Sequence, residues 1–230
     1  MNQLSSKTTL ANPFLLEIDE KVIIHDKLKR AFDILFSLIA LLLCLPLFAI
    51  LYCLIKYNSP GPVFYCSLRI GRQGRLFKFW KLRSMYQDAD DRLDLLLNSN
   101  PDLKKEWQQY FKLKQDPRLT SLGRFLRSTS LDELPQFWNV LIGDLSITGP
   151  RPYLPREIKR IHEILGKNVD KLFSVRPGLT GIWQTSGRNH LTFDERVNLE
   201  ASYADQCCFT LDLRLIAKTV PILLFRKGAF

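Results

Sequence analysis

The stretch ILFSLIALLLCLPLFAILYCLI, residues 34–55, decides the fold, because it contains no charged side chain. As a helix it would be about 33 Å long, close to the thickness of a bilayer core. A secretory signal peptide fits this run poorly, because the run begins late, is too long and lacks a small-residue cleavage site. The sequence therefore predicts a membrane element near the N-terminus.

Pro46 and the flanking charges bear on how this element meets the membrane. A proline inside a helix removes one hydrogen bond and costs about 3 kcal/mol. Basic residues stand on both sides of the run, from Lys21 to Arg30 before it and from Lys56 to Arg83 after it. The positive-inside rule rewards an asymmetry between the two flanks, and little exists here. A re-entrant helix broken at Pro46 and a kinked span both remain open, and a buried core hairpin is less favoured.

The composition narrows the class of protein. The 230 residues carry 33 Lys and Arg against 23 Asp and Glu, a formal charge of +10, with 46% apolar and 24% charged residues. These values exclude a disordered chain, a disulfide framework and a polytopic membrane protein. The basic surplus indicates an anionic partner: nucleic acid, anionic lipid or a phosphorylated substrate. The cysteines form no C-x-x-C pair, which favours reduced thiols in a cytosolic setting.

The chain is predicted to have three parts. Residues 1–26 are a flexible polar and basic arm, residues 27–57 are the membrane element broken at Pro46, and residues 58–230 are the remaining domain. The predicted fold class is α+β, mainly α. It comprises the membrane helix, which in the re-entrant interpretation is a helix–break–helix at Pro46, a small β-hairpin, several short helices and an amphipathic C-terminal helix on the membrane surface.

Local patterns place these elements along the chain. Residues 63–85 alternate apolar and polar side chains around a turn at 71–74, which predicts a strand pair. Helical periodicity covers residues 88–114, 120–126, 131–141, 158–169 and 193–207. Residues 211–227 mix apolar and basic side chains, as a surface-lying amphipathic helix does.

Adjacent carboxylates at Asp132 and Glu133 are the first candidate site. Neighbouring side chains on a helix point about 100° apart, so one carboxylate can attack or bind while the other holds a metal. The alternative is a helix opened by Ser130 as N-cap, with Glu133 at the capping-box spacing. From spacing alone the capping interpretation is favoured.

Two arginines in turns are the second candidate. Arg151 lies between two prolines, on a backbone that loses little entropy when the guanidinium grips a phosphate. Arg188 follows Ser186-Gly187 in another turn. Both arginines could equally be solvated loop residues.

Five blocks in order make the pattern specific. They are KRAFDILFSLIALLLCLPLF, PGPVFYCSLRIGRQGRLFKFWKLRSM, LTSLGRFLRSTSLDELPQFWNVLIGDLSITGPRP, VRPGLTGIWQTSGRN and the basic apolar tail. With these blocks the chain resembles the bacterial sugar transferases, the monotopic polyprenyl-phosphate phosphoglycosyl transferases. The resemblance extends from about Lys27 to the C-terminus, and the chain is expected to be the minimal catalytic form of that family.

The resemblance implies an activity. Asp132 would attack the β-phosphate of a UDP-sugar, release UMP and form a covalent phosphosugar intermediate, which undecaprenyl phosphate would then attack. Glu133 would bind Mg²⁺ together with Asp132. This would be the first membrane step of exopolysaccharide or surface glycan synthesis. The protein would lie on the inner membrane with its catalytic domain on the cytoplasmic face.

The resemblance also implies further site residues. By their positions in the motifs, Arg127, Arg151, Arg188 and Lys81 would contact phosphate or nucleotide. Asp144 is a weaker candidate that could simply cap a turn. The family's re-entrant helix, broken at a proline, raises that interpretation of Pro46 above a span.

Two other classes of function remain as alternatives. A membrane-attached glycosyltransferase would release UDP instead of UMP, and a non-catalytic basic membrane adaptor would give no turnover. The expected partners are a UDP-sugar, undecaprenyl phosphate and inner-membrane lipids, with no nucleic acid. A homodimer is compatible with the sequence, which identifies neither the sugar nor the pathway.

Overall fold

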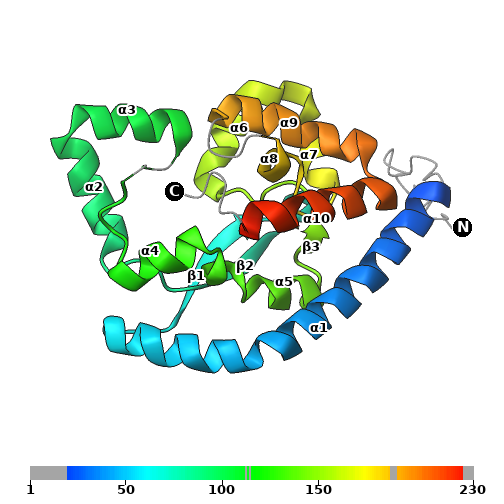
Figure 1. Ribbon diagram of the computed structural model, residues 1–230. Helices are drawn as coiled ribbons and strands as arrows, with labels where there is room; N and C mark the ends of the chain where they lie inside the picture. Colours follow the sequence, from blue (N-terminus) through cyan, green and yellow to red (C-terminus); the bar gives the residue numbers. More distant parts are fainter. Residues whose placement is uncertain (1–19, 112, 114, 187–190, 225–230) are drawn as a thin grey trace, which may run out of the picture.

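A long helix dominates the architecture. The computed structural model describes residues 20–224, apart from 112, 114 and 187–190. Helix α1 (Glu20–Asn58) is assigned as one continuous helix with Pro46 inside it. The expected break at Pro46 is therefore a correction: no residue there leaves the helix. Figure 1 shows that α1 is nevertheless bent, so that its two arms run in different directions. A proline removes one helical hydrogen bond without unwinding its neighbours, and such a bend is its usual effect.

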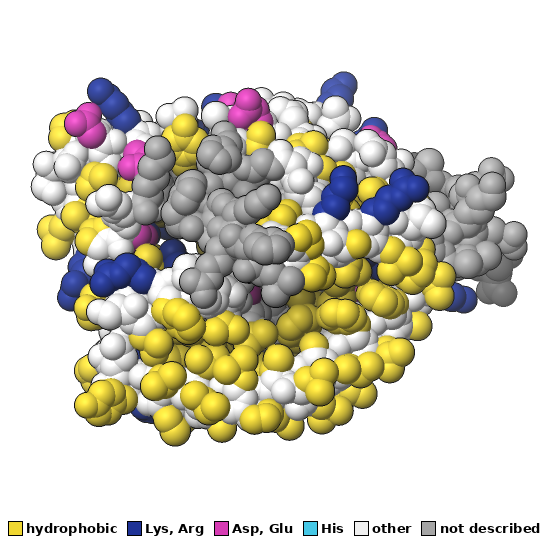
Figure 2. Space-filling model, in the orientation of Figure 1, with side chains coloured by type: hydrophobic (Ala, Val, Ile, Leu, Met, Phe, Trp, Pro, Cys, Tyr) yellow, Lys and Arg dark blue, Asp and Glu magenta, His cyan; other side chains and the backbone are white. Residues whose placement is uncertain are grey.

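Most of the apolar surface of α1 faces outward. Only 11% of its most apolar window is buried, and Leu43 is 74% exposed. Figure 2 shows these hydrophobic side chains gathered over α1 and continuing toward α10 (Phe209–Leu224). By length and composition α1 could cross a membrane. A soluble helix would bury such a face, so this surface requires an apolar partner.

The predicted hairpin is confirmed. Strands β1 (Phe64–Ile70) and β2 (Leu76–Leu82) pair antiparallel, with Ser67 opposite Phe79. The chain reverses through η1 (Arg72–Gly74), where Gln73 and Gly74 have φ values of 58° and 74°. Two of the alternating side chains on β2, Phe77 and Phe79, are buried against α5 (Gln136–Ile142) and β3 (Ser146–Thr148).

The helical patterns are mostly confirmed, but three of the expected helices are divided: residues 131–141 form a 3-10 turn followed by α5, and residues 158–169 form a helix, a 3-10 turn and the start of the next helix. The single helix expected over residues 88–114 is two helices, α2 (Ala89–Ser99) and α3 (Pro101–Tyr110). The residue before a proline is disfavoured in helical conformation, and Asn100 instead caps α3 by accepting hydrogen bonds from the backbone of Asp102 and Leu103. The other short elements are α4 (Ser121–Ser128), η2 (Leu131–Glu133), η3 (Pro155–Glu157), α6 (Ile158–Leu165), η4 (Gly166–Asn168), α7 (Val169–Ser174), α8 (Ile182–Thr185) and α9 (Phe193–Gln206).

A second, parallel strand pair was not predicted. Strand β3 pairs with β4 (Gly178–Thr180), so that Ser146 lies opposite Gly178. The approach is close, because a Cβ added to Gly149 would lie 2.3 Å from the carbonyl oxygen of Arg176. This pair brings the two Gly-Pro-rich loops together beside α9.

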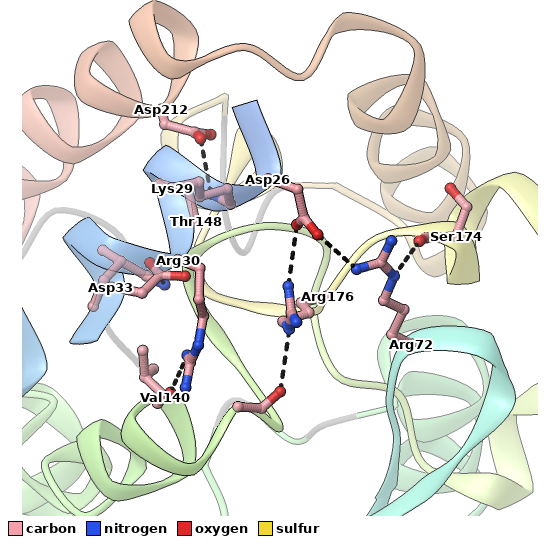
Figure 3. Close-up of polar contacts among 12 residues, drawn as sticks. Asp26, Lys29, Arg30, Asp33, Arg72, Val140, Thr148, Ser174, Arg176 and Asp212 are labelled. Atoms are coloured by element: carbon pink, nitrogen blue, oxygen red, sulfur yellow. Dashed lines mark hydrogen bonds and ion pairs between the residues drawn. The ribbon is translucent and has the colours of Figure 1, made fainter. Parts of the chain in front are cut away.

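Polar side chains fix the N-terminal arm of α1 to the rest of the fold (Figure 3). Lys29 donates to Asp212 of α10 at 2.8 Å and also contacts Thr148. Arg30 donates to the carbonyl oxygens of Val140 and Leu141 at 2.6 and 2.8 Å, in the last turn of α5, where carbonyls lack helical partners. The arm is therefore held by directional contacts as well as by packing.

Two acidic side chains complete this attachment. Asp33, which is 1% exposed, accepts a hydrogen bond from the backbone N–H of Ile147 at 2.9 Å. Asp26 accepts from Arg72 at 3.2 Å and from Arg176 at 3.1 Å, as Figure 3 shows. The polar end of α1 thus touches the turn of the hairpin, β3 and the loop before β4.

The buried pair of Lys29 and Asp212 predicts a large loss on mutation. Their side chains are 12% and 4% exposed. Removing one partner of a buried ion pair costs about 3–5 kcal/mol, because the other charge loses its compensation. Lys29→Met should lower the free energy of unfolding by that amount, measured by urea titration in mild detergent.

A matched control is Lys171→Met. Lys171 pairs with Asp205 at 3.1 Å, but these side chains are 54% and 58% exposed. An exposed pair contributes about 0–1 kcal/mol. Equal losses in the two variants would contradict the anchoring role of Lys29.

Candidate active site

The two adjacent carboxylates lie on a short turn rather than on a long helix. Asp132 and Glu133 belong to η2, a single 3-10 turn between α4 and α5. The predicted capping box is wrong: Ser130 has φ 57° and its side chain makes no cap hydrogen bond. A left-handed residue cannot present its hydroxyl as an N-cap does, because that role needs an extended backbone. The dyad therefore requires another explanation than capping.

Packing seats this turn on the membrane helix. Leu131 and Leu134, on either side of the dyad, pack against a buried cluster that includes Leu51 and Ile55 of α1. Leu126 of α4, which is fully buried, completes the contact. The carboxylates are thus held at a fixed position relative to the C-terminal arm of α1.

Lys81 joins the two carboxylates. Its Nζ lies 2.7 Å from Oε1 of Glu133 and 3.6 Å from Oδ2 of Asp132. Lys81 comes from β2, so the hairpin delivers the cation to the turn. The Asp132 side chain is 4% exposed, whereas that of Glu133 is 44% exposed. One carboxylate is enclosed and the other is accessible.

The surroundings shift the pKa values of the two carboxyl groups in opposite directions. Burial raises the pKa of Asp132, and the charge of Lys81 offsets this only in part. Partial burial disfavours the ionised form of Glu133 too, but the hydrogen-bonded ammonium of Lys81 and the charge of Arg151 outweigh it and hold its pKa below the ordinary value. Carboxylates with such divergent acidities are typical of sites that do chemistry.

Arg127 approaches the dyad from α4. Its Nε donates to the hydroxyl of Ser84 at 3.2 Å, and its charge acts on Asp132. In the described part of the chain no carboxylate lies within 4.0 Å of the Arg127 guanidinium. This predicted residue is therefore brought to the site with its charge available for an anion.

Arg151 follows β3 and is the second predicted arginine that acts on the dyad. Its backbone N–H donates to Oε2 of Glu200 at 2.8 Å, and its guanidinium lies 5.7 Å from the centre of the Trp183 ring. Its charge also acts on Glu133. The two predicted arginines thus act on different members of the dyad, Arg127 on Asp132 and Arg151 on Glu133.

Two other predicted residues remain to be considered. Arg188 falls outside the described residues. Asp144 accepts a hydrogen bond at 3.1 Å from the side chain of Asn139, which also bonds the backbone of Lys78 and Trp80. Asp144 therefore supports the junction of α5 with β2, as a turn residue would.

The two carboxylates could bind a divalent cation if a bound phosphate and water supplied its remaining ligands. Among the described residues, no group of three or more His, Cys, Asp or Glu side chains could bind a metal. Mg²⁺ commonly uses one or two carboxylates and takes its remaining ligands from phosphates and water. Glu133, with its exposed oxygens, and Asp132 fit that requirement.

Several residues around Arg151 were missed by the sequence analysis. Arg69, Trp183, Arg196 and Glu200 surround it, and burial raises the pKa of Glu200 to about 7. The i, i+4 spacing of Arg196 and Glu200 places them on one face of α9, a weak signal that ordinary surface pairs share. Only the fold brings them to the loop at 149–152.

Comparison with known proteins gives consistent matches. Residues 24–226 match the family described as Bacterial sugar transferase. The chain is 42% identical over 203 residues to the undecaprenyl-phosphate galactose phosphotransferase of Salmonella typhimurium, covering 88% of this chain and 42% of that protein. It is 37% identical over 228 residues to the exopolysaccharide production protein ExoY of Rhizobium meliloti, covering 98% and 99% of the two chains.

A third relative is the UDP-glucose:undecaprenyl-phosphate glucose-1-phosphate transferase of Escherichia coli, which is 34% identical over 208 residues. The chain spans 42% of the length of the Salmonella protein and 41% of that of the Escherichia protein. The matched part contains the dyad, Lys81 and the arginines described above. Because the match covers most of the chain, this protein belongs to the bacterial sugar transferase family.

Proposed function

We propose that the protein is a phosphoglycosyl transferase that moves a sugar-1-phosphate from a UDP-sugar to undecaprenyl phosphate. The observation that carries this proposal is the enclosed Asp132 carboxylate, paired with Lys81 and next to Glu133, with the charges of Arg127 and Arg151 acting on the dyad. Two of the relatives are named as a galactose phosphotransferase and a glucose-1-phosphate transferase, and these names support a hexose donor. UDP-galactose and UDP-glucose are therefore the first donors to test.

The proposed reaction has two displacements at one phosphorus atom. An Oδ atom of Asp132 attacks the β-phosphorus of the donor, the bond to the α,β-bridging oxygen breaks, and UMP leaves with that oxygen. A phosphate oxygen of undecaprenyl phosphate then attacks the same phosphorus and displaces Asp132. Splitting the reaction lets one site serve a soluble donor first and a lipid acceptor second.

The surrounding charges address the main obstacle to this chemistry. A carboxylate attacking a diphosphate meets electrostatic repulsion, which fixed cations in an enclosed site offset. Lys81 opposes the rise that burial causes in the pKa of Asp132 and lowers the pKa of Glu133, while Arg127 and Arg151 have charge available for the phosphates. Mg²⁺, held by Glu133 and Asp132 with the diphosphate, would neutralise further negative charge.

The proposal includes a placement of the protein in the membrane. In our proposal α1 enters the membrane as a re-entrant helix bent at Pro46, with both ends on the cytoplasmic side of the inner membrane. Support comes from its exposed apolar face and its basic flanks. The polar contacts of Asp26, Lys29 and Asp33 with the domain after residue 58 favour an N-terminal arm that stays on that domain's side. A homodimer stays a prediction.

Asp132→Asn tests the nucleophile. The amide cannot form the covalent intermediate, so UMP release from a UDP-hexose in the presence of undecaprenyl phosphate should fall by about 10³-fold or more. Asp170→Asn, at an exposed acid of α7, is the control and should leave the rate unchanged. UDP in place of UMP would indicate simple glycosyl transfer. No release by folded protein with any UDP-sugar would indicate a non-catalytic adaptor.

Metal removal is a second test. EDTA should lower the rate of UMP release by at least about tenfold, because the repulsion between dyad and diphosphate would lose its divalent counterion. Added MgCl₂ should restore the rate. Glu133→Gln should raise the Mg²⁺ concentration needed for half-maximal rate, and an unchanged Mg²⁺ requirement would remove Glu133 from the metal site.

The exposed face of α1 predicts membrane attachment. Leu43→Asp places a charge near the middle of that face, which costs about 2.5–3.5 kcal/mol in a bilayer. The variant should float with lipid vesicles far less than the parent. Leu95→Asp is a matched control, since Leu95 is 70% exposed on α2. Equal flotation of both variants would argue against a lipid-facing α1.

Protease accessibility of an N-terminal tag separates the two membrane topologies. A re-entrant α1 leaves the tag on the same side as the domain after residue 58, so both should be cleaved together in inverted inner-membrane vesicles. Cleavage of the domain alone would favour a true span.

A further inference from the structure

Among the residues that the structure describes, three buried N–H donors beside the candidate site have no acceptor. They are Nε of Arg151, Nε of Arg196 and Nε1 of Trp183. An unsatisfied buried donor costs about 1–3 kcal/mol, and more when it is charged. Such groups are rare in folded proteins and call for a specific explanation, such as a ligand.

The three side chains lie together. The guanidinium carbons of Arg151 and Arg196 are 5.7 and 5.2 Å from the centre of the Trp183 ring. Burial and then the charge of Arg151 lower the pKa of Arg196, which means that the two cations repel each other at short range. Both guanidinium groups therefore make a cation–π contact with the same ring, that of Trp183.

Nearby carboxylates do not accept hydrogen bonds from these three N–H groups among the described residues. Oε2 of Glu200 accepts from the hydroxyl of Tyr153 at 2.9 Å and from the backbone of Arg151, and Oε2 of Glu157 accepts from the backbone of Leu154. Within the described residues, neither Arg151 nor Arg196 has a carboxylate oxygen within 4.0 Å of its guanidinium. These acids bond Tyr153 and the backbone, and Oε1 of Glu200, itself buried without a partner among the described residues, forms no ion pair with either arginine there.

The chemistry of the missing acceptor follows from the donors. Arginine and tryptophan side chains offer N–H groups and no acceptor, so the ligand must be rich in acceptor oxygens and negatively charged. A phosphate group meets both conditions. Arg151 also acts on Glu133, so this phosphate would lie next to the one at the dyad rather than at a remote surface.

We propose that Arg151, Arg196 and Trp183 form the subsite for the phosphate of the leaving nucleotide, adjacent to the position where Asp132 attacks. The assignment rests on the proposed function, which supplies two neighbouring phosphates in one donor. Lys81 and Arg127 serve the phosphate that is transferred, and the Arg151–Arg196–Trp183 subsite keeps the phosphate that departs as UMP. Arg196 and Trp183 are thereby additional donor-binding residues.

Calorimetric titration of UMP into the protein in detergent tests this subsite without turnover. Arg196→Gln should raise the Kd of UMP about 10- to 100-fold, the effect of losing a charge-assisted hydrogen bond. Uridine, which lacks the phosphate, should bind parent and variant equally. Arg196→Lys should recover part of the loss, and Trp183→Phe, which keeps a ring but lacks the N–H, should weaken UMP by a few-fold.

Arg160→Gln is the matched control, since Arg160 is 49% exposed and pairs with acids on the surface. Its Kd for UMP should equal that of the parent. Unchanged UMP binding in Arg196→Gln with a normal unfolding midpoint would overturn the subsite, and so would an equal loss of uridine. A parent that binds neither UMP nor UDP would instead overturn the proposed function, and the subsite with it.

Discussion

The packing of the turn that carries the dyad onto α1 is the contact on which the rest of the arrangement depends. Leu131 and Leu134 are apolar anchors on either side of two charged residues, and they lie against Leu51, Ile55 and Leu126. Such burial is non-directional and contributes about 1.5–3 kcal/mol for each fully buried side chain. It explains why two carboxylates can occupy a short turn without a helix to hold them: the leucines, and not the capping chemistry, fix the backbone.

A second kind of contact orients what the first one holds. Apolar packing alone would let α1 rotate, because its exposed face is apolar nearly all round. The ion pair of Lys29 with Asp212 and the hydrogen bond to Asp33 allow only one rotation and one register of the N-terminal arm (Figure 3). The helix is therefore attached by packing near its C-terminal end and by directional polar contacts near its N-terminal end, with the bend between them. A charged substitution on the outer face should leave both attachments intact, because Leu43 belongs to neither.

The elements that could be predicted from the sequence are those specified by nearby residues. Alternation over residues 63–85 sufficed for the hairpin, and periodicity sufficed for α9. The parallel pair of β3 and β4 could not be predicted, because each strand has three residues and its partner lies far along the chain. Ser130 had the right spacing for a capping box, but its left-handed backbone excluded one. For the site, motifs identified the dyad, Lys81, Arg127 and Arg151, whereas Arg196 and Trp183 join it only through tertiary packing.

The arginines at the site bear on the ionisation of Asp132, the proposed nucleophile. Burial already favours the neutral form of Asp132, and an incoming diphosphate would favour it further. A neutral carboxyl is a poor nucleophile, so donor binding would oppose the proposed attack unless cations accompany the phosphates. Arg127, Arg151 and Arg196 supply that charge before the donor arrives, at the cost of mutual repulsion in the empty site. Under this argument Arg127 acts on both reactants, because its charge is available for the phosphates and also lowers the pKa of Asp132 against the effect of burial.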